Sequence, residues 1–117
     1  MILYIYPKCS TCRSAVKYLE ENNIEFEERD IVLNRPNYEE LEEYIKLSGK
    51  KIEKFFNTSG MKYRELGLKD KIPQMSDKEK IELLASDGML VKRPMLIGND
   101  FVLNGFRLKD WEERFNK

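Results

Sequence analysis

The sequence predicts an α/β protein in which a strand-helix-strand unit and a strand-strand-helix unit are separated by a helical insert. Two observations predict this order. Short apolar runs rich in strand-forming residues lie near both ends of the chain, and residues between about 36 and 88 show mainly helical spacing. The chain has 117 residues, of which 41% are hydrophobic, enough for a core of ordinary size. We therefore expect a single domain over residues 1–117.

The first unit is predicted from three neighbouring segments. Residues 2–5 are a continuous apolar run, as expected for a strand covered on both faces. Ser10 and Thr11 are good N-cap residues, so a helix should begin there and end at residues 22–23. Residues 24–31 alternate between apolar and polar and predict a second strand, parallel to the first because a helix connects the two.

The insert is predicted to begin with a helix that starts at Asn37 and ends at Gly49. Short helical segments are expected at residues 52–56 and 62–66, with a turn between them. The capping-box spacing of Ser76-Asp77-Lys78-Glu79 predicts one more helix.

The last unit contains a hairpin and a helix. Apolar residues 94–97 and 101–103 flank Gly98-Asn99-Asp100, which is typical of a β-hairpin turn. Residues 108–115 have the spacing of a final amphipathic helix.

Cys9 and Cys12 are the only two cysteines, and they lie at the predicted junction of the first strand and helix. A disulfide between them would close too small a loop to stabilise the fold much through chain entropy. Structural zinc usually takes four Cys or His ligands, and the chain has no histidine, so no metal site is expected. Polar neighbours, including Ser10 and Thr11, make a purely buried pair the weaker explanation. A redox-active thiol pair is the leading hypothesis.

The junction offers ways to stabilise a thiolate, which is the nucleophilic form of cysteine. A helix N-terminus presents unpaired N–H groups, and Lys8 and Arg13 add cations, each effect contributing about 0.3–1 kcal/mol when exposed. Both cations are equally explained as solvated surface charges. Cys9 lies nearer the helix N-terminus, so we expect it to be the nucleophile. Cys12, about one turn further on, is expected to resolve a mixed disulfide formed on Cys9.

Three segments resemble the arsenate reductase / Spx family in matching order and spacing across nearly the whole chain. They are Tyr6-Pro7-Lys8-Cys9-Ser10-Thr11-Cys12-Arg13, Phe56-Asn57-Thr58-Ser59-Gly60 with the following Tyr63-Arg64-Glu65-Leu66-Gly67-Leu68, and Gly88-Met89-Leu90-Val91-Lys92-Arg93-Pro94. The resemblance implies a thioredoxin-like fold, with a four-stranded mixed sheet flanked by helices and an insert at about residues 36–88. It also gives Cys9 the position of the catalytic cysteine.

Arg93-Pro94 is a second candidate part of the site. Proline removes a ladder donor, so it is expected at a strand start or in a cis turn, and the resemblance implies that Pro94 is cis beside the cysteines. Arg93 would then hold an oxyanion or carboxylate near Cys9, the alternative being a surface ion pair. Asn57 belongs either to the wall of this site or to a plain turn.

The sequence departs from the arsenate-reducing members of the family at their three site arginines. Only Arg93 aligns with one of them, while the other two positions fall at about Asn57 and Gly105. Those members also carry serine where this chain has Cys12. One cation is a weak clamp for a multiply charged oxyanion, so disulfide exchange is favoured over arsenate reduction. We expect no bound cofactor, with glutathione, glutaredoxin or thioredoxin as the external electron donor.

A redox-sensing transcriptional regulator is the alternative function. The resemblance implies that Spx-type members use the Cys-x-x-Cys motif as a switch and bind the C-terminal domain of the RNA polymerase α subunit. Gly49, beside Lys50-Lys51, approximates a glycine that supports that contact, although a helix C-cap explains it as well.

The charge balance bears on localisation and partners. Lys and Arg total 21, and Asp and Glu total 21, so no overall field favours nucleic acid or an anionic membrane. Residues 1–6 are too short for a signal peptide or a membrane span. We therefore expect a cytoplasmic protein. In that reducing compartment a close cysteine pair is more often catalytic or sensing than permanently bridged, so a thiol donor is the expected partner.

Overall fold

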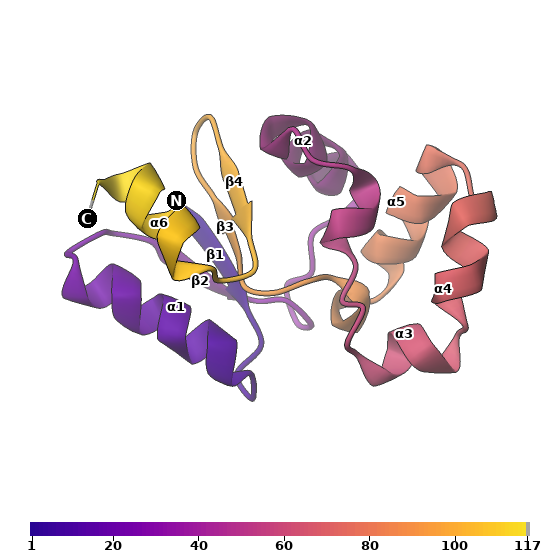
Figure 1. Cartoon of the computed structure of the whole chain (residues 1–117), viewed down its shortest axis with the longest axis horizontal. Helices are drawn as coiled ribbons and strands as arrows, with labels where there is room; N and C mark the ends of the chain where they lie inside the picture. Colours follow the sequence, from indigo (N-terminus) through magenta and orange to yellow (C-terminus); the bar gives the residue numbers. More distant parts are fainter. Residues whose placement is uncertain (117) are drawn as a thin grey trace.

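Four strands form one mixed sheet in the computed structural model, which describes residues 1–116 (Figure 1). The strands are β1 (Ile2–Ile5), β2 (Glu27–Asp30), β3 (Met95–Ile97) and β4 (Val102–Asn104), in the order β2-β1-β3-β4. β1 pairs in parallel with β2 and antiparallel with β3, and β3 pairs antiparallel with β4. The expected four-stranded mixed sheet is confirmed.

Helices cover both faces of this sheet. Six α-helices are present in residues 1–116: α1 (Ser10–Glu21), α2 (Tyr38–Ser48), α3 (Met61–Glu65), α4 (Leu68–Lys71), α5 (Asp77–Ser86) and α6 (Leu108–Phe115). Short 3-10 turns are η1 (Ile52–Phe55), η2 (Ile72–Gln74) and η3 (Gly88–Leu90). Figure 1 shows α1 and α6 on one side of the sheet and the helical insert on the other, with α3, α4 and α5 farthest from the strands. In this part of the chain, every helix is too short or too polar to cross a bilayer.

The alternation of side chains along β1 divides the interior into two cores. Leu3 and Ile5 point to the core beneath α1 and α6, which also contains Trp111. Tyr4 points to the larger core beneath the insert, together with Leu41 of α2. Both faces of the strand are therefore buried, which is why its sequence is a continuous apolar run.

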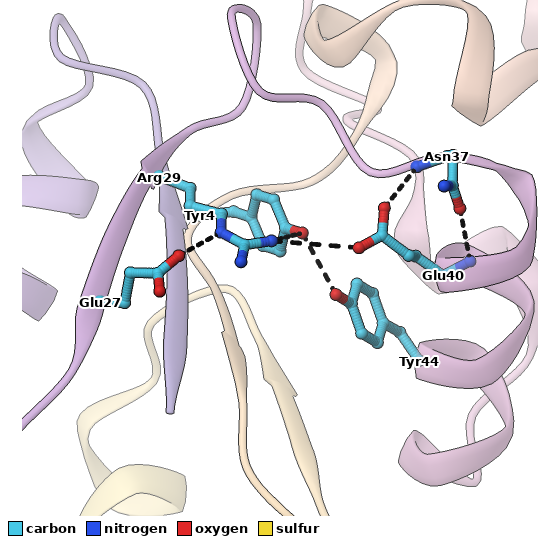
Figure 2. A network of polar contacts seen from close by, with 6 residues as sticks. All are labelled: Tyr4, Glu27, Arg29, Asn37, Glu40 and Tyr44. Atoms are coloured by element: carbon cyan, nitrogen blue, oxygen red, sulfur yellow. Dashed lines mark hydrogen bonds and ion pairs between the residues drawn. The ribbon is translucent and has the colours of Figure 1, made fainter.

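A polar network joins the sheet to the insert (Figure 2). The hydroxyls of Tyr4 and Tyr44 lie 3.2 Å apart, and Arg29 Nη1 donates to Tyr4 Oη at 3.3 Å. Arg29 also forms an ion pair with Glu27 and lies 3.9 Å from Glu40 Oε2. Burial and the hydrogen bond with Tyr4 raise the pKa of Tyr44, so its hydroxyl stays protonated and remains able to donate.

The predicted helix caps are confirmed in the insert. Asn37 forms a capping box with Glu40 at the start of α2, and Ser76 forms one with Glu79 at the start of α5. Gly49 ends α2 in the left-handed conformation, with φ of +67°, which glycine adopts without steric cost.

The second strand is shorter than the predicted range of 24–31. Its ladder begins where the N–H of Glu27 donates to the carbonyl of Met1, at 2.8 Å, and Glu27 pairs with Ile2, the first residue of β1. Ile24 instead donates to the carbonyl of Leu19 at the end of α1, at 2.9 Å. The short helix α4 was not predicted, since four residues carry too little periodicity to recognise.

Candidate active site

Cys9 is itself the N-cap of α1. Its backbone is extended, with φ of −94° and ψ of 117°, and its Sγ accepts the backbone N–H of Cys12 at 3.4 Å. The expectation that Ser10 or Thr11 caps this helix is wrong, because the chain turns one residue earlier and makes Ser10 the first helical residue. The correction places the half-buried sulfur directly at the positive end of the helix.

The surroundings of Cys9 favour its thiolate. Partial burial opposes ionisation, but hydrogen bonds from the thiol and the backbone N–H of Cys12 outweigh it, helped by the charge of Arg93 and the backbone N–H of Thr11. Together they lower the pKa of Cys9 below its ordinary value. A larger fraction of Cys9 is therefore nucleophilic at neutral pH than in an isolated cysteine.

Cys12 has the opposite environment. Its side chain is fully buried in the core beneath α1 and α6, and its Sγ accepts the N–H of Tyr6 at 3.5 Å. Burial, together with the hydrogen bond and charge of Cys9, raises the pKa of Cys12 to about 12. Both residues are free thiols, so the pair consists of one accessible ionisable sulfur and one protected protonated sulfur.

Arg93 lies beside the thiols with part of its donor capacity unused. The peptide bond between Arg93 and the buried Pro94 is cis, as the resemblance implies, and β3 begins at the next residue. The guanidinium carbon lies 4.9 Å from the centre of the Tyr6 ring. Its Nη1 is buried and has no hydrogen-bond partner among residues 1–116. Buried donors are nearly always paired, so this nitrogen keeps the capacity to donate one more hydrogen bond.

A cavity of about 320 Å³, here called the thiol cavity, opens beside Cys9 and Arg93. Four segments contribute its other lining residues: Thr11 from α1, Asn57 and Ser59 from the turn before α3, Lys92 beside Arg93, and residues 104–107, which begin at the last residue of β4. Asn57 thus belongs to the wall of the cavity as well as to a turn.

Backbone hydrogen bonds hold these segments together. The N–H of Asn57 donates to the carbonyl of Leu90 at 2.8 Å, and that of Lys92 donates to the carbonyl of Phe55 at 2.7 Å. On the other side, the N–H of Gly105 donates to the carbonyl of Pro94 at 2.7 Å. Three of the segments that line the thiol cavity are therefore tied to neighbouring chain by backbone hydrogen bonds.

The other candidate residues near the cysteines lie outside this cavity. Lys8 lines a separate hollow with Pro7 and Leu33. Ser10 and Arg13 are exposed on the first turn of α1. The structure therefore does not bring Lys8, Ser10 or Arg13 to the lining of the thiol cavity.

Two cations at the site were missed by the sequence reasoning. Lys92 and Arg107 line the thiol cavity together with Arg93, so the cavity has more cations than the alignment with the family arginines counted. A Cβ at Gly105 would lie 2.9 Å from Lys92 Cε and 3.5 Å from Lys92 Nζ. Lys92 thus occupies space that an arginine side chain at position 105 would need. The adjacent Lys92-Arg93 pair in the sequence could have suggested a second cation at the site. Nothing in the sequence indicates that the Lys92 side chain lines the same cavity.

Comparisons with known proteins agree with this architecture. The sequence matches the model of the ArsC family over residues 4–114. It is 50% identical over 115 residues to the uncharacterized protein YusI of Bacillus subtilis, covering 98% of each chain. It is 31% identical over 106 residues to the regulatory protein MgsR of the same organism, covering 91% of this chain and 82% of MgsR.

Solved structures show the same fold. An ArsC family related protein from Bacteroides fragilis superposes with a TM-score of 0.93 at 51% identity, covering 96% of this chain and 94% of that one. A structure described as a possible arsenate reductase from Streptococcus mutans superposes with a TM-score of 0.87 at 44% identity, covering 95% and 96%. The thioredoxin-like fold is confirmed, and the chain belongs to the ArsC family.

Proposed function

We propose that this protein is a thiol–disulfide oxidoreductase of the cytoplasm, with Cys9 as nucleophile and Cys12 as resolving thiol. The observation that carries the proposal is the contrast between the two sulfurs. Cys9 is accessible with a lowered pKa, while Cys12, one turn further along α1, is buried with a raised one. A dithiol that attacks and then resolves needs this division of roles.

In the first step, the Cys9 thiolate attacks one sulfur of a substrate disulfide. A bond forms between that sulfur and Cys9 Sγ, the substrate S–S bond breaks, and the departing thiolate takes up a proton from water. Arg93 lines the thiol cavity and its charge already favours the Cys9 thiolate, so it also stabilises negative charge that develops there.

In the second step, Cys12 loses its proton to solvent and its sulfur attacks Cys9 Sγ. The Cys9–Cys12 disulfide forms and the second substrate thiolate leaves, so two electrons pass from the protein dithiol to the substrate disulfide. The negative charge of Cys9 contributes to the raised pKa of Cys12. Because the mixed disulfide removes that charge, Cys12 becomes easier to ionise when it is needed.

External thiols complete the cycle. Glutathione with glutaredoxin, or thioredoxin, would reduce the Cys9–Cys12 disulfide by the same exchange chemistry. Since Lys92 and Arg107 join Arg93 at the cavity, an oxyanion such as arsenate is the competing substrate and belongs in the same activity panel.

The rate of alkylation of Cys9 against pH tests the proposal. In a Cys12→Ser variant, Cys9 is the only thiol, and its reaction with iodoacetamide should reach half its maximal rate below the ordinary cysteine pKa of about 8.5. The variant with both cysteines replaced by serine is the blank. A half-maximal rate at or above that pH would overturn the nucleophile assignment.

The second candidate function is a redox-controlled transcriptional regulator. The observation that favours it is the 31% identity to a protein named as a regulator, MgsR, over 91% of this chain. Gly49 is exposed and has no atom within 4 Å of where a Cβ would lie, so its surroundings leave room for a partner. Retention on the C-terminal domain of the RNA polymerase α subunit that differs between oxidised and reduced protein would support this function. Equal retention, or none, would exclude it.

A further inference from the structure

A second cavity lies next to the thiol cavity and is crowded with positive charge. It has a volume of about 500 Å³ and is lined by five cations, Lys50, Lys51, Lys54, Lys92 and Arg107, with Asp110 as the one carboxylate. We call it the lysine cavity. The 117 residues include equal numbers of basic and acidic residues, so this excess is local.

Most of these charges lack a counter-charge. Arg107 Nε lies 3.8 Å from Asp110 Oδ2. No carboxylate of residues 1–116 lies within 4.0 Å of the ammonium groups of Lys50, Lys54 or Lys92. Partial burial and the charges of Lys92, Arg107 and Lys54 lower the pKa of Lys50, with Asp110 opposing them. A bound anion would relieve this repulsion.

The cavity is held by tertiary contacts and does not depend on flexible lysines alone. Asn104 Oδ1 at the end of β4 accepts a hydrogen bond from Lys50 Nζ at 2.8 Å. Asn104 Nδ2 donates to the backbone carbonyl of Lys54 at 2.7 Å. One amide therefore joins the hairpin to the segment after α2 and positions the ammonium of Lys50.

The two cavities are adjacent and share three lining residues. Lys92, Asn104 and Arg107 line both of them, so a ligand whose sulfur reaches Cys9 can extend past Lys92 into the lysine cavity. A volume of about 500 Å³ lies within the usual range for small-molecule sites.

We propose that the lysine cavity binds the anionic part of a small disulfide substrate, one that carries at least two carboxylate or phosphate groups, while Arg93 and Cys9 engage its sulfur end. This inference rests on the proposed function, because it names the substrate class for that same site. The exchange step is unchanged: Cys9 forms a bond with one substrate sulfur, and the substrate S–S bond breaks.

Binding to a protein without reactive cysteines tests the site separately from the chemistry. The Cys9→Ser/Cys12→Ser variant is titrated with S-methylglutathione, a carboxylate-bearing probe, and with S-methyl coenzyme A, a phosphate-bearing probe, while backbone amide NMR signals are followed. We expect shifts at Gly49, Lys50 and Asn104. Replacing Lys50 and Lys54 by methionine should raise the Kd of the tighter probe at least tenfold. Lys46→Met is the matched control, since Lys46 is exposed on α2 outside the cavity.

Each outcome of the titration decides the proposal. Binding of S-methylglutathione alone would show that the lysine cavity recognises carboxylates. Binding of S-methyl coenzyme A alone would show that it recognises phosphates. Binding of neither probe, or a Kd that changes equally in the Lys46→Met control, overturns it. Binding of polyglutamate but of neither small probe overturns it as well, and indicates an acidic protein partner.

Kinetics with intact thiols separates failure of the inference from failure of the proposed function. When Lys50 and Lys54 are replaced, kcat/KM should fall for both disulfides. The fold decrease for glutathione disulfide should be at least five times that for the neutral bis(2-hydroxyethyl) disulfide. Equal losses with both disulfides would overturn the inference alone. If the probes bind but wild-type protein reduces no disulfide, the anion site stands and the proposed function fails.

Discussion

The N-terminus of α1 and the lysine cavity acquire their positive charge in different ways. At the N-terminus of α1, the Cys9 sulfur meets the backbone N–H of Cys12 at 3.4 Å, which is a directional contact within one helical turn. In the lysine cavity, charge comes from long side chains of three segments, residues 49–54, Lys92 and residues 104–110.

This difference suits the helix end to stabilising the thiolate and the lysine cavity to binding a charged ligand. Backbone donors are fixed by the helix, so they can stabilise a thiolate at one position without reorganising. Exposed lysines carry rotamer freedom and are screened by salt, so they suit the recognition of charge more than its exact placement. Lys92 lies where the two regions meet, and we expect changes there to affect both.

The largest effect should come from the helix end. In Cys12→Ser, a mixed disulfide formed on Cys9 cannot be resolved, so disulfide turnover with a dithiol donor such as thioredoxin should fall at least about 100-fold. Mass spectrometry of the intact protein should show the trapped adduct. Turnover at the wild-type rate without adduct would indicate a single-cysteine mechanism that uses external thiol.

Arg93 tests how much of the thiolate stabilisation comes from a side chain. Because the charge of Arg93 lowers the pKa of Cys9, Arg93→Met should raise that pKa. A shift of one unit would lower the Cys9 alkylation rate near neutral pH about tenfold. The rate should still increase with pH, because the thiolate is the reactive form. Arg93→Lys keeps the charge and should retain more of the effect, and an unchanged pKa in Arg93→Met would assign the stabilisation to the helix end alone.

Ionic strength should separate the two regions without any substitution. Raising the salt concentration from 50 to 500 mM should lower kcat/KM for glutathione disulfide about fivefold, because exposed lysine charges are screened. The pH dependence of Cys9 alkylation should change much less, since it depends mainly on hydrogen bonds. A similar loss for glutathione disulfide and a neutral disulfide would contradict the distinction.

The smallest effect on the two cavities should come from breaking the Lys80–Glu53 ion pair, which lines neither of them. Lys80 is only 8% exposed, and its Nζ lies 2.5 Å from Glu53 Oε1. Glu53→Gln should destabilise the fold by about 0.5–1 kcal/mol in urea unfolding, because Lys80 loses its counter-charge while water screens the 46% exposed side chain of Glu53. Cys9 alkylation should be unchanged. A change in alkylation would show that the insert and the thiols are coupled.

The same pair predicts a pH dependence of stability. Lys80 lowers the pKa of Glu53, so the unfolded state binds the proton more readily than the folded state does. The contribution of the Lys80–Glu53 pair to the free energy of unfolding is therefore present above the ordinary glutamate pKa. It is lost as the pH falls through the pKa of Glu53 in the folded state. Urea unfolding of wild type and Glu53→Gln should converge at acid pH, and a constant difference would contradict the assignment.

Much of the fold was predictable because its signals are local. The capping boxes at Asn37 and Ser76, the left-handed cap at Gly49 and the final helix over residues 108–115 all depend on residues within a few positions of one another. The start of β2 was misplaced because it depends on where β1 begins, which is a long-range condition.

In the candidate site, too, the features that depend on neighbouring residues were predictable from the sequence. The sequence by itself determined that two thiols follow a strand and begin a helix, because strand, turn and helix signals occupy the first 21 residues. It also placed Arg93 before a proline that the structure shows to be cis.

Only the tertiary structure decided how the two sulfurs differ and where the cations gather. Cys12 is buried because the core beneath α1 and α6 closes over it, and that burial is the largest cause of its raised pKa. Lys50, Lys92 and Arg107 are far apart in sequence, and they meet because β4, through Asn104, contacts the chain that follows α2. A side chain's charge is set by its residue type, but its neighbours are set by packing between distant segments.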